Sequence, residues 1–367
     1  MSRLLQATKS TKNYAFRDWL CDNSGPIVRY LVARDLARSA KYDLKRLQGV
    51  VLESSIVRYW LGCLTGRTGF NDIYGCRDTC FENAMGKLTL FGLRKGVSDL
   101  DRCCVPYLAW LEQNTRSRRK DVLFDLSRAI VASFLAMAGY LSERCVRDSV
   151  LQRLAAIYYF VKSNDFTIYA EKSGFRGIPV AFRRHPLVNP ELYSNHGFPL
   201  PWIYDILAFR ALRTHLGDGA IDSRVERVIS YVLDPRYQQF YEGYGIVRAR
   251  NNRYYAMGWN VWLPRYRGLH ADSPEMGCLV QRLELLSRFH IARSSRWFKE
   301  NLEMLEGHRN QSGRYAFPKN YIQERQNSYY VTGGHMGLGE NRRQRLTREI
   351  ESTYWMVRIH NNVGTAS

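Results

Sequence analysis

The sequence predicts an all-α protein in which paired helices surround a central cavity, and three observations support this fold class. Several windows carry apolar residues at positions i, i+3, i+4 and i+7, whereas few alternate with the period of two that is typical of strands. Of the 367 residues, 45% are hydrophobic and 13% are aromatic, which is enough for a large core. Four segments repeat one plan of two helices joined by a short turn; they span residues 80–112, 124–160, 202–234 and 276–308.

The two helices of each repeat differ in their hydrophobic pattern. The first helix is apolar on more than one side, as expected of a helix buried all round, and the second is amphipathic with charges on one face. An inner ring of buried helices and an outer ring of half-exposed helices would produce this difference and leave a cavity at the axis. In chain order, we expect helices at about 27–38, 43–63, 80–93, 100–113, 121–140, 143–162, 201–216, 222–233, 275–290, 294–308 and 347–360.

Proline and glycine set several of these boundaries. Pro26 follows Gly25 at a position that suits the first turn of a helix, and the second helix is expected to end before Gly66. Aromatic residues are frequent in the long segments between helices, so we expect packed loops there and a single domain over residues 1–367. These long loops are expected at about 163–200, 237–273 and 311–345.

Charge and cysteine content restrict the environment and the partners. The chain has 54 Lys and Arg against 34 Asp and Glu, a formal net charge of +20 that attracts nucleic acid, anionic membranes or acidic small molecules. Eight cysteines are too few for a disulfide scaffold in a chain of this length, so reduced thiols and a cytoplasmic location are expected. The longest apolar stretch, residues 129–141, falls short of the ~20 residues that span a bilayer.

Four segments resemble a known superfamily. PIVRYLVARDLA at 26–37, the helix pair at 200–234, QSGRYAF at 311–317 and ESTYWMVRI at 351–359 are similar to uncharacterised bacterial proteins related to squalene cyclases and prenyltransferases. These belong to the terpenoid cyclase and protein prenyltransferase superfamily of (α/α)6 toroids. The resemblance implies a closed double ring of helical hairpins and an enzyme that acts on a small, partly apolar substrate. The chain lacks the D-x-D-D and D-D-x-x-D motifs of the superfamily's cyclases, so the reaction type is unresolved.

One short motif resembles the zinc site of protein prenyltransferases. Asp78 and Cys80 form a D-x-C pair at the start of an expected inner helix, and zinc binds carboxylate, thiolate and imidazole groups. Cys76 and either His196 or His335 are candidates for the remaining ligands. The alternative is that Asp78 caps the helix and Cys80 is a small buried residue. Zinc is therefore a candidate cofactor.

The segment YSNHGFPLPWIYD precedes and begins another inner helix. We expect Trp202, Tyr204 and Asp205 at the mouth of the cavity with His196 above them, and Tyr193 in contact with the substrate. One carboxylate and one imidazole beside aromatic rings suit general acid–base catalysis, or stabilisation of a cation by the ring faces. The alternative is that Asp205 caps its helix and the aromatic side chains fill the core.

Further candidates lie at the ends of the helix series. Glu351 is a candidate catalytic carboxylate, and Tyr354 and Trp355 lie within one helical turn of it as candidate substrate contacts. His335 in a glycine-rich loop and Asn83 in the first turn of an inner helix complete the expected substrate contacts. The alternative for the last helix is aromatic packing alone.

Two readings of function follow. The first is a cyclase-like or transferase-like enzyme whose small, partly apolar substrate carries an acidic group attracted by the basic charge. The second is a non-catalytic module that binds a peptide, a lipid or a nucleic acid through the cavity or the basic surface. Basic runs at 116–120 and 342–345 and interleaved Tyr and Arg at 244–267 carry the nucleic-acid alternative, although the first run is most simply a solvated turn.

Overall fold

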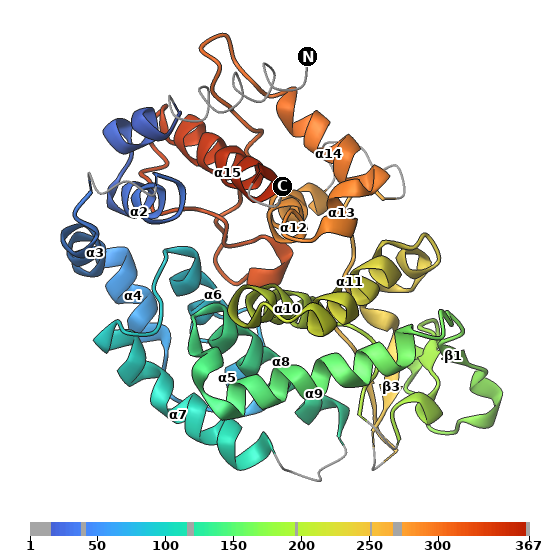
Figure 1. Cartoon of the computed structure of the whole chain (residues 1–367). Coiled ribbons are helices and arrows are strands. Elements are labelled where there is room, and N and C mark those ends of the chain that lie inside the picture. Colours follow the sequence, from blue (N-terminus) through green and yellow to red (C-terminus); the bar gives the residue numbers. More distant parts are fainter. Residues whose placement is uncertain are drawn as a thin grey trace.

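The computed structural model describes residues 16–37, 42–115, 121–194, 197–249, 252–266 and 274–364. This part of the chain is mainly helical with one small sheet (Figure 1). The helices, in chain order, include α2 (Pro26–Leu31), its π-helical continuation η1 (Val32–Ala37), α3 (Leu44–Glu53), α4 (Ser55–Cys63), α5 (Phe70–Ile73), α6 (Phe81–Leu90), α7 (Ser98–Thr115), α8 (Val122–Met137), α9 (Arg144–Val161), α10 (Ile203–Leu216), α11 (Gly219–Leu233), α12 (Leu279–Leu286), α13 (His290–Ser294), α14 (Arg296–Glu306) and α15 (Thr347–Gly364).

Capping side chains explain where the expected helix over 43–63 divides. The Asp43 carboxylate accepts a hydrogen bond from the backbone N–H of Arg46 at 3.0 Å and begins α3. Ser54 ends α3, and its hydroxyl accepts a hydrogen bond from the backbone N–H of Val57 at 3.4 Å, which begins α4. The hydrophobic pattern continues across Ser54, so periodicity alone merges the two helices.

The alternation of buried and half-exposed helices is confirmed. All ten residues of α6 and all eight of α12 are buried, whereas α7 has five buried residues among eighteen and α14 four among eleven. We call α6, α8, α10, α12 and α15, in which most residues are buried, the inner helices. They pack in sequence: α6 against α8, α8 against α10, α10 against α12, and α12 against α15.

The two ends of the helix series lie side by side (Figure 1). Helix α15 packs against η1, and the Arg358 Nη1 atom lies 4.0 Å from the Asp35 Oδ2 atom. Arg17, in the helical stretch before α2, donates a hydrogen bond to the Asn361 side chain at 3.4 Å. Segments more than three hundred residues apart in the chain are therefore neighbours in space.

The sheet corrects the all-α expectation. It is built from β1 (Tyr169–Ala170), β2 (Leu187–Val188), β3 (Ile246–Arg248) and β4 (Tyr254–Ala256), in this spatial order. The β1–β2 and β3–β4 pairs are antiparallel and the β2–β3 pair is parallel. These strands lie within the long segments predicted as loops, and two or three residues are too few to show alternation in the sequence.

The third long loop packs against an inner helix through a glycine. Tyr330 begins the 3-10 helix η9 (Tyr330–Thr332). The Tyr330 ring lies against Gly86 of α6. A Cβ atom at Gly86 would lie 2.4 Å from the Tyr330 ring, so a larger residue at this position would displace the loop. The loop thereby becomes part of the core.

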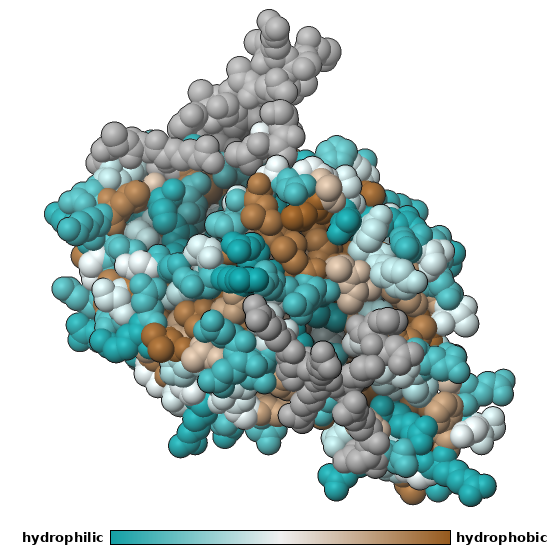
Figure 2. Space-filling view, turned by 60° about the horizontal axis from the view of Figure 1, so that its bottom comes forward, coloured by the Kyte–Doolittle hydropathy of each residue, from teal (hydrophilic) through white to brown (hydrophobic). Residues whose placement is uncertain are grey.

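Most core side chains belong to one hydrophobic cluster that runs from Leu20 to Ile359. None of the eight cysteines, all of which lie in the described ranges, is paired in a disulfide. No helix in the described ranges has both the length and the apolar character needed to cross a bilayer. The face shown in Figure 2 is covered mainly by hydrophilic side chains, with hydrophobic side chains gathered in separate patches.

Candidate functional site

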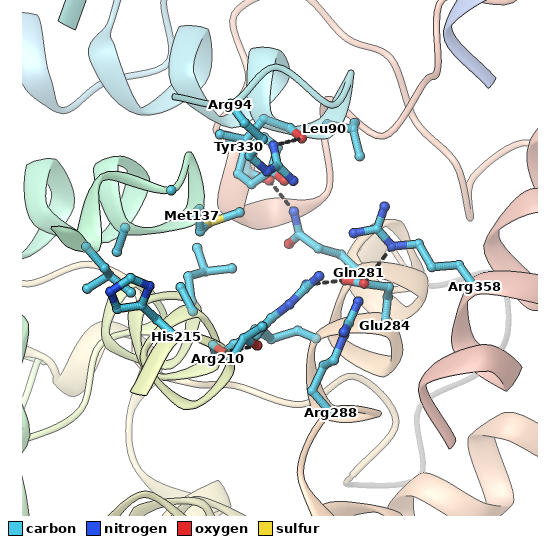
Figure 3. Close-up of a pocket in the computed structure, with 18 of the residues that line it drawn as sticks. Leu90, Arg94, Met137, Arg210, His215, Gln281, Glu284, Arg288, Tyr330 and Arg358 are labelled. Atoms are coloured by element: carbon cyan, nitrogen blue, oxygen red, sulfur yellow. Dashed lines mark hydrogen bonds and ion pairs between the residues drawn. The ribbon is translucent and has the colours of Figure 1, made fainter. Parts of the chain in front are cut away.

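A cavity of about 300 Å³ lies among the C-terminal ends of α6, α8, α10 and α12, beside the middle of α15 (Figure 3). Helices α6, α8, α10, α12 and α15 each contribute to its wall, and the third long loop adds Tyr330 and Met336. This volume is at the lower end of the range for small-molecule sites. The cavity is therefore the first place to look for a ligand.

Four arginines and one carboxylate make up most of the charge in the cavity wall. The arginines are Arg94, Arg210, Arg288 and Arg358, and the carboxylate is Glu284. Glu284 accepts hydrogen bonds from Arg210 Nη1 at 2.6 Å and from Arg358 Nε at 2.8 Å. Four guanidinium groups against one carboxylate leave a formal excess of three positive charges in the wall.

The pKa values of these groups reflect the crowding of positive charge. Burial, together with repulsion from nearby guanidinium groups, lowers the pKa of Arg94 to about 9 and that of Arg288 to about 10. Burial alone would raise the pKa of Glu284, but attraction from Arg210 and Arg358 outweighs it and holds this pKa below its usual range. An anion in the cavity would relieve the repulsion between the arginines.

Two of the arginines have donors free for a ligand. Among the described residues, the Arg288 side chain has no hydrogen-bond acceptor, and it is exposed to the cavity. Arg94 uses its Nη1 atom to donate to the carbonyl oxygens of Thr89 at 2.8 Å and Leu93 at 2.7 Å, at the end of α6. In Figure 3, Arg94 lies across the cavity from Arg210, Arg288 and Glu284.

The rest of the wall is largely apolar. Trp355 lines the cavity, and its indole N–H has no hydrogen-bond partner among the described residues. His215 and Thr214, both exposed, stand at the end of α10. The cavity thus combines hydrogen-bond donors with hydrophobic surface. The apolar lining residues are Leu90, Ala136, Met137, Leu141, Leu207, Ala211, Leu285 and Met336.

The predicted mouth lies at the opposite end of α10 from the cavity. Asp205 and Trp202 lie at the N-terminal end of α10, and neither lines the cavity. The Asp205 carboxylate accepts hydrogen bonds from Arg153 Nε at 2.9 Å and Nη2 at 2.8 Å, and from the Trp202 backbone N–H at 2.9 Å. Trp202 is stacked between Phe198 and the Arg153 guanidinium. These residues fix the start of α10, which corresponds to the structural alternative considered for them.

Tyr204 and Asn83 are also held within the core. The Tyr204 hydroxyl donates to Glu82, which is fully buried and also accepts a hydrogen bond from the Gly75 backbone N–H at 3.3 Å. Burial raises the pKa of Glu82 to about 8. Asn83 accepts a hydrogen bond from the Tyr330 backbone N–H at 2.7 Å and donates to the Gly75 carbonyl at 2.9 Å. Asn83 thereby connects the third long loop to α6.

In the last helix, one predicted contact lines the cavity and two lie outside its wall. Glu351 accepts hydrogen bonds from the Leu338 backbone N–H at 2.7 Å and from Arg342 Nη2 at 2.9 Å, so it anchors the third long loop. The Tyr354 hydroxyl accepts a hydrogen bond from Arg358 Nη1 at 2.8 Å. Trp355 is the predicted substrate contact that reaches the cavity.

His335 and Tyr193 do not line this cavity. His335 is 1% exposed, and its Nε2 atom lies 2.8 Å from the Ser328 carbonyl oxygen. Tyr193 lines a separate cavity of about 320 Å³, and its hydroxyl accepts a hydrogen bond from the Arg248 backbone N–H at 2.9 Å. His196 lies outside the described residues.

The described residues provide no complete set of zinc ligands. The Asp78 carboxylate accepts a hydrogen bond from the Tyr59 hydroxyl at 2.7 Å. Cys80 is the N-cap residue of α6, and its thiol donates to the Asn71 carbonyl oxygen at 3.5 Å. Within the described ranges, no group of three or more His, Cys, Asp or Glu side chains is arranged to hold a metal ion.

Comparison of the chain with protein-family models, curated proteins and solved structures gave no match. The site therefore has to be interpreted from its own chemistry.

Sequence reasoning missed the charged residues of the cavity, although a signal for them was present. Arg210 lies in the apolar run ILAFRAL, Glu284 in RLELL, and Arg358 in WMVRI. The first two runs belong to helices predicted to be buried all round, where a charge is costly unless it is paired or bound to a ligand. Charges in such helices should therefore have been treated as candidate site residues.

Proposed function

We propose that the protein binds a small molecule with an anionic group and an apolar portion in the cavity among the inner helices. The observation that carries this proposal is the excess of three arginines over carboxylates in a wall that is otherwise mainly apolar. Guanidinium groups bind carboxylate and phosphate oxygens through paired hydrogen bonds. Leu90, Met137 and Leu285 would cover the apolar portion.

The alternative that the arginines serve only to cap helix C-termini explains part of the cluster. Arg94 does donate to carbonyl oxygens at the end of α6. Capping does not account for Arg288, which has no acceptor among the described residues and faces the cavity. An unpaired cation beside other cations raises the energy of the empty site, and binding an anion lowers it.

We also propose that the helix pairs form the closed (α/α)6 double ring expected from the sequence, within one domain. The contact between η1 and α15 supports closure, because an open array would separate the first and last helices. The cavity would then lie on the axis of the ring, as the superfamily resemblance implies.

A binding role explains the site better than cyclase-like catalysis does. Asp205, Tyr204 and Glu351 were the expected acid–base groups, and each is hydrogen-bonded to other parts of the fold away from the cavity. A reaction in the cavity would have to use Glu284 or His215 as its acid or base. Attraction from the arginines keeps Glu284 ionised, which makes it a poor acid.

The experiment is a binding series with three probes: inorganic phosphate, octanol, and octyl phosphate, which combines the anionic group of the first with the apolar chain of the second. We expect octyl phosphate to bind at least about 10-fold more tightly than either other probe, because it alone uses both parts of the wall. Arg288→Gln should weaken octyl phosphate binding about 10-fold or more. The matched control is Arg296→Gln, which removes an 89% exposed arginine of α14 and should bind as the wild type does.

Isothermal titration calorimetry measures these affinities, and native mass spectrometry of the purified protein would detect a retained ligand. Equal affinity of Arg288→Gln and the wild type for octyl phosphate would refute the site. Octanol binding as tightly as octyl phosphate would refute the role of the arginines.

A further inference from the structure

The loop between β1 and β2, residues 171–186, is a projection with a small core of its own. Leu187, Ile246 and Tyr254 form a hydrophobic cluster separate from the main core, and Phe175, Ile178 and Phe182 of the projection pack against it. The projection extends from the side of the molecule next to β1 (Figure 1). It is not part of the cavity described above.

The projection presents an apolar tip between basic side chains. Val180, in the 3-10 helix η4 (Val180–Phe182), is 73% exposed, the highest value among the exposed large hydrophobic side chains of the described residues. Arg176, Arg183 and Arg184 are exposed on either side of it in the sequence. With Lys172, the projection has four basic residues and a single acidic residue, Glu171.

Hydrogen bonds hold the backbone that carries these arginines. Lys172 Nζ donates to the Arg183 carbonyl oxygen at 2.7 Å, and the Tyr254 hydroxyl donates to the Arg176 carbonyl oxygen at 3.0 Å. Val180 is therefore exposed on a loop whose backbone is held by hydrogen bonds. An exposed valine in such a loop has an unfavourable contact with water that the fold does not remove.

We infer that this projection docks the protein on an anionic lipid bilayer. The charge of the projection is complementary to the lipid phosphates, and an exposed aliphatic side chain between cations matches the boundary between headgroups and acyl chains. Arg176, Arg183 and Arg184 would bind headgroup phosphates, and Val180 would enter the acyl boundary. Attachment through one aliphatic side chain and a few cations is weak and reversible.

The same surface fits a nucleic acid less well. Single-stranded nucleic acids bind through exposed aromatic rings on which bases stack, in addition to cations. The aromatic rings of the projection are not free, because Phe175 and Phe182 pack against the small core. The Val180 side chain has neither a ring to stack on a base nor a donor for a hydrogen bond to a phosphate.

The test is co-sedimentation of the full chain with vesicles of phosphatidylcholine alone and of phosphatidylcholine with 30 mol% phosphatidylglycerol. We expect binding to the anionic vesicles and little binding to the neutral ones. Arg183→Gln with Arg184→Gln should weaken binding about 30-fold, at about fivefold per cation near the surface. Val180→Asp should weaken it about 10-fold or more, because an apolar contact is replaced by a charge that anionic lipid repels.

Two control variants make the same chemical changes at other exposed positions. Val105→Asp replaces a valine that is 60% exposed on α7, and Arg343→Gln with Arg345→Gln removes two exposed arginines from the third long loop. Both controls should bind vesicles like the wild type. Circular dichroism melting of each variant verifies folding.

The inference fails if the wild type does not bind anionic vesicles, or if the controls weaken binding as much as the variants of the projection do. The inference also fails if the chain binds a single-stranded RNA oligonucleotide tightly, if the Arg183/Arg184 double variant loses this binding, and if Val180→Asp keeps it. In that outcome, neither variant changes binding to the vesicles. The cavity variant Arg288→Gln should bind vesicles normally, so this proposal and the proposed function can fail separately.

Discussion

Glu284→Gln tests the charge balance of the cavity directly, because Glu284 is the carboxylate that holds two of its arginines. The substitution keeps the shape of the side chain and removes its charge. Arg210 and Arg358 then each lose a charged acceptor, at 2.6 Å and 2.8 Å, while Glu284 itself is only 5% exposed. Removing one partner of a buried ion pair costs about 3–5 kcal/mol, and we expect the lower end because the glutamine oxygen still accepts one hydrogen bond.

An added anion should restore part of this loss. A free anion would replace the missing carboxylate as a partner for the arginines, and it would no longer be repelled by Glu284. At a phosphate concentration of 100 times its Kd, the linked stabilisation is about 2.7 kcal/mol. We therefore expect phosphate to stabilise Glu284→Gln by about 1–3 kcal/mol more than it stabilises the wild type.

Urea unfolding followed by tryptophan fluorescence measures both effects. Urea is preferred because guanidinium chloride would add molar chloride, and sodium chloride keeps the ionic strength equal in samples without phosphate. The control is Glu226→Gln, which breaks a half-exposed pair with Arg213 outside the cavity and should lose about 1 kcal/mol. Phosphate should have no added effect on that control. If Glu284→Gln loses less than about 1 kcal/mol, or if phosphate stabilises it no more than the wild type, the charge-balance argument is wrong.

Three further outcomes are expected from urea unfolding. Burial raises the pKa of Glu82 from its ordinary value of 4.5 to about 8, so the stability that Glu82 contributes is present below pH 4.5 and is lost as the pH rises to about 8. The free energy of unfolding of Glu82→Gln should match that of the wild type at pH 5 and exceed it by up to about 5 kcal/mol at pH 9. Equal pH profiles of the two proteins would contradict this. Asp205→Asn should lose about 3 kcal/mol because Arg153 is left without its carboxylate, yet it should keep ligand binding, and lost binding would return Asp205 to the site. Lys87→Met should lose about 3 kcal/mol and expose the third long loop to proteolysis, because Lys87 donates to Glu324 at 2.5 Å; wild-type resistance to protease would show that the anchor is dispensable.

The helices could be predicted because each carries many residues of one period. The ten buried residues of α6 and the mixture of buried and exposed residues in α7 correspond to two different hydrophobic patterns in the sequence. The strands could not, since each has only two or three residues, and the parallel β2–β3 pair joins distant segments. The division at Ser54 depends on one hydroxyl that accepts a hydrogen bond, and hydrophobic periodicity does not register it.

The residues singled out in the sequence and the cavity lie at opposite ends of α10 for a physical reason. Aromatic and acidic residues at the start of α10 were interpreted as functional, but a carboxylate in the first turn of a helix also stabilises that turn. Asp205 does this while it pairs with Arg153, whose position 52 residues earlier gives no sign of the contact. Local sequence cannot distinguish a cap from a catalytic acid when the partner is distant.

The C-terminal ends of helices carry partial negative charge, which favours nearby arginines and disfavours an anionic ligand. The cavity lies where the C-terminal ends of α6, α8, α10 and α12 meet, so a few arginines would be expected there for helix stability alone. Two features exceed that need: the Arg288 side chain has no hydrogen-bond acceptor among the described residues, and Glu284 already accepts hydrogen bonds from Arg210 and Arg358. The remaining positive charge therefore points to an anion that the fold itself does not supply.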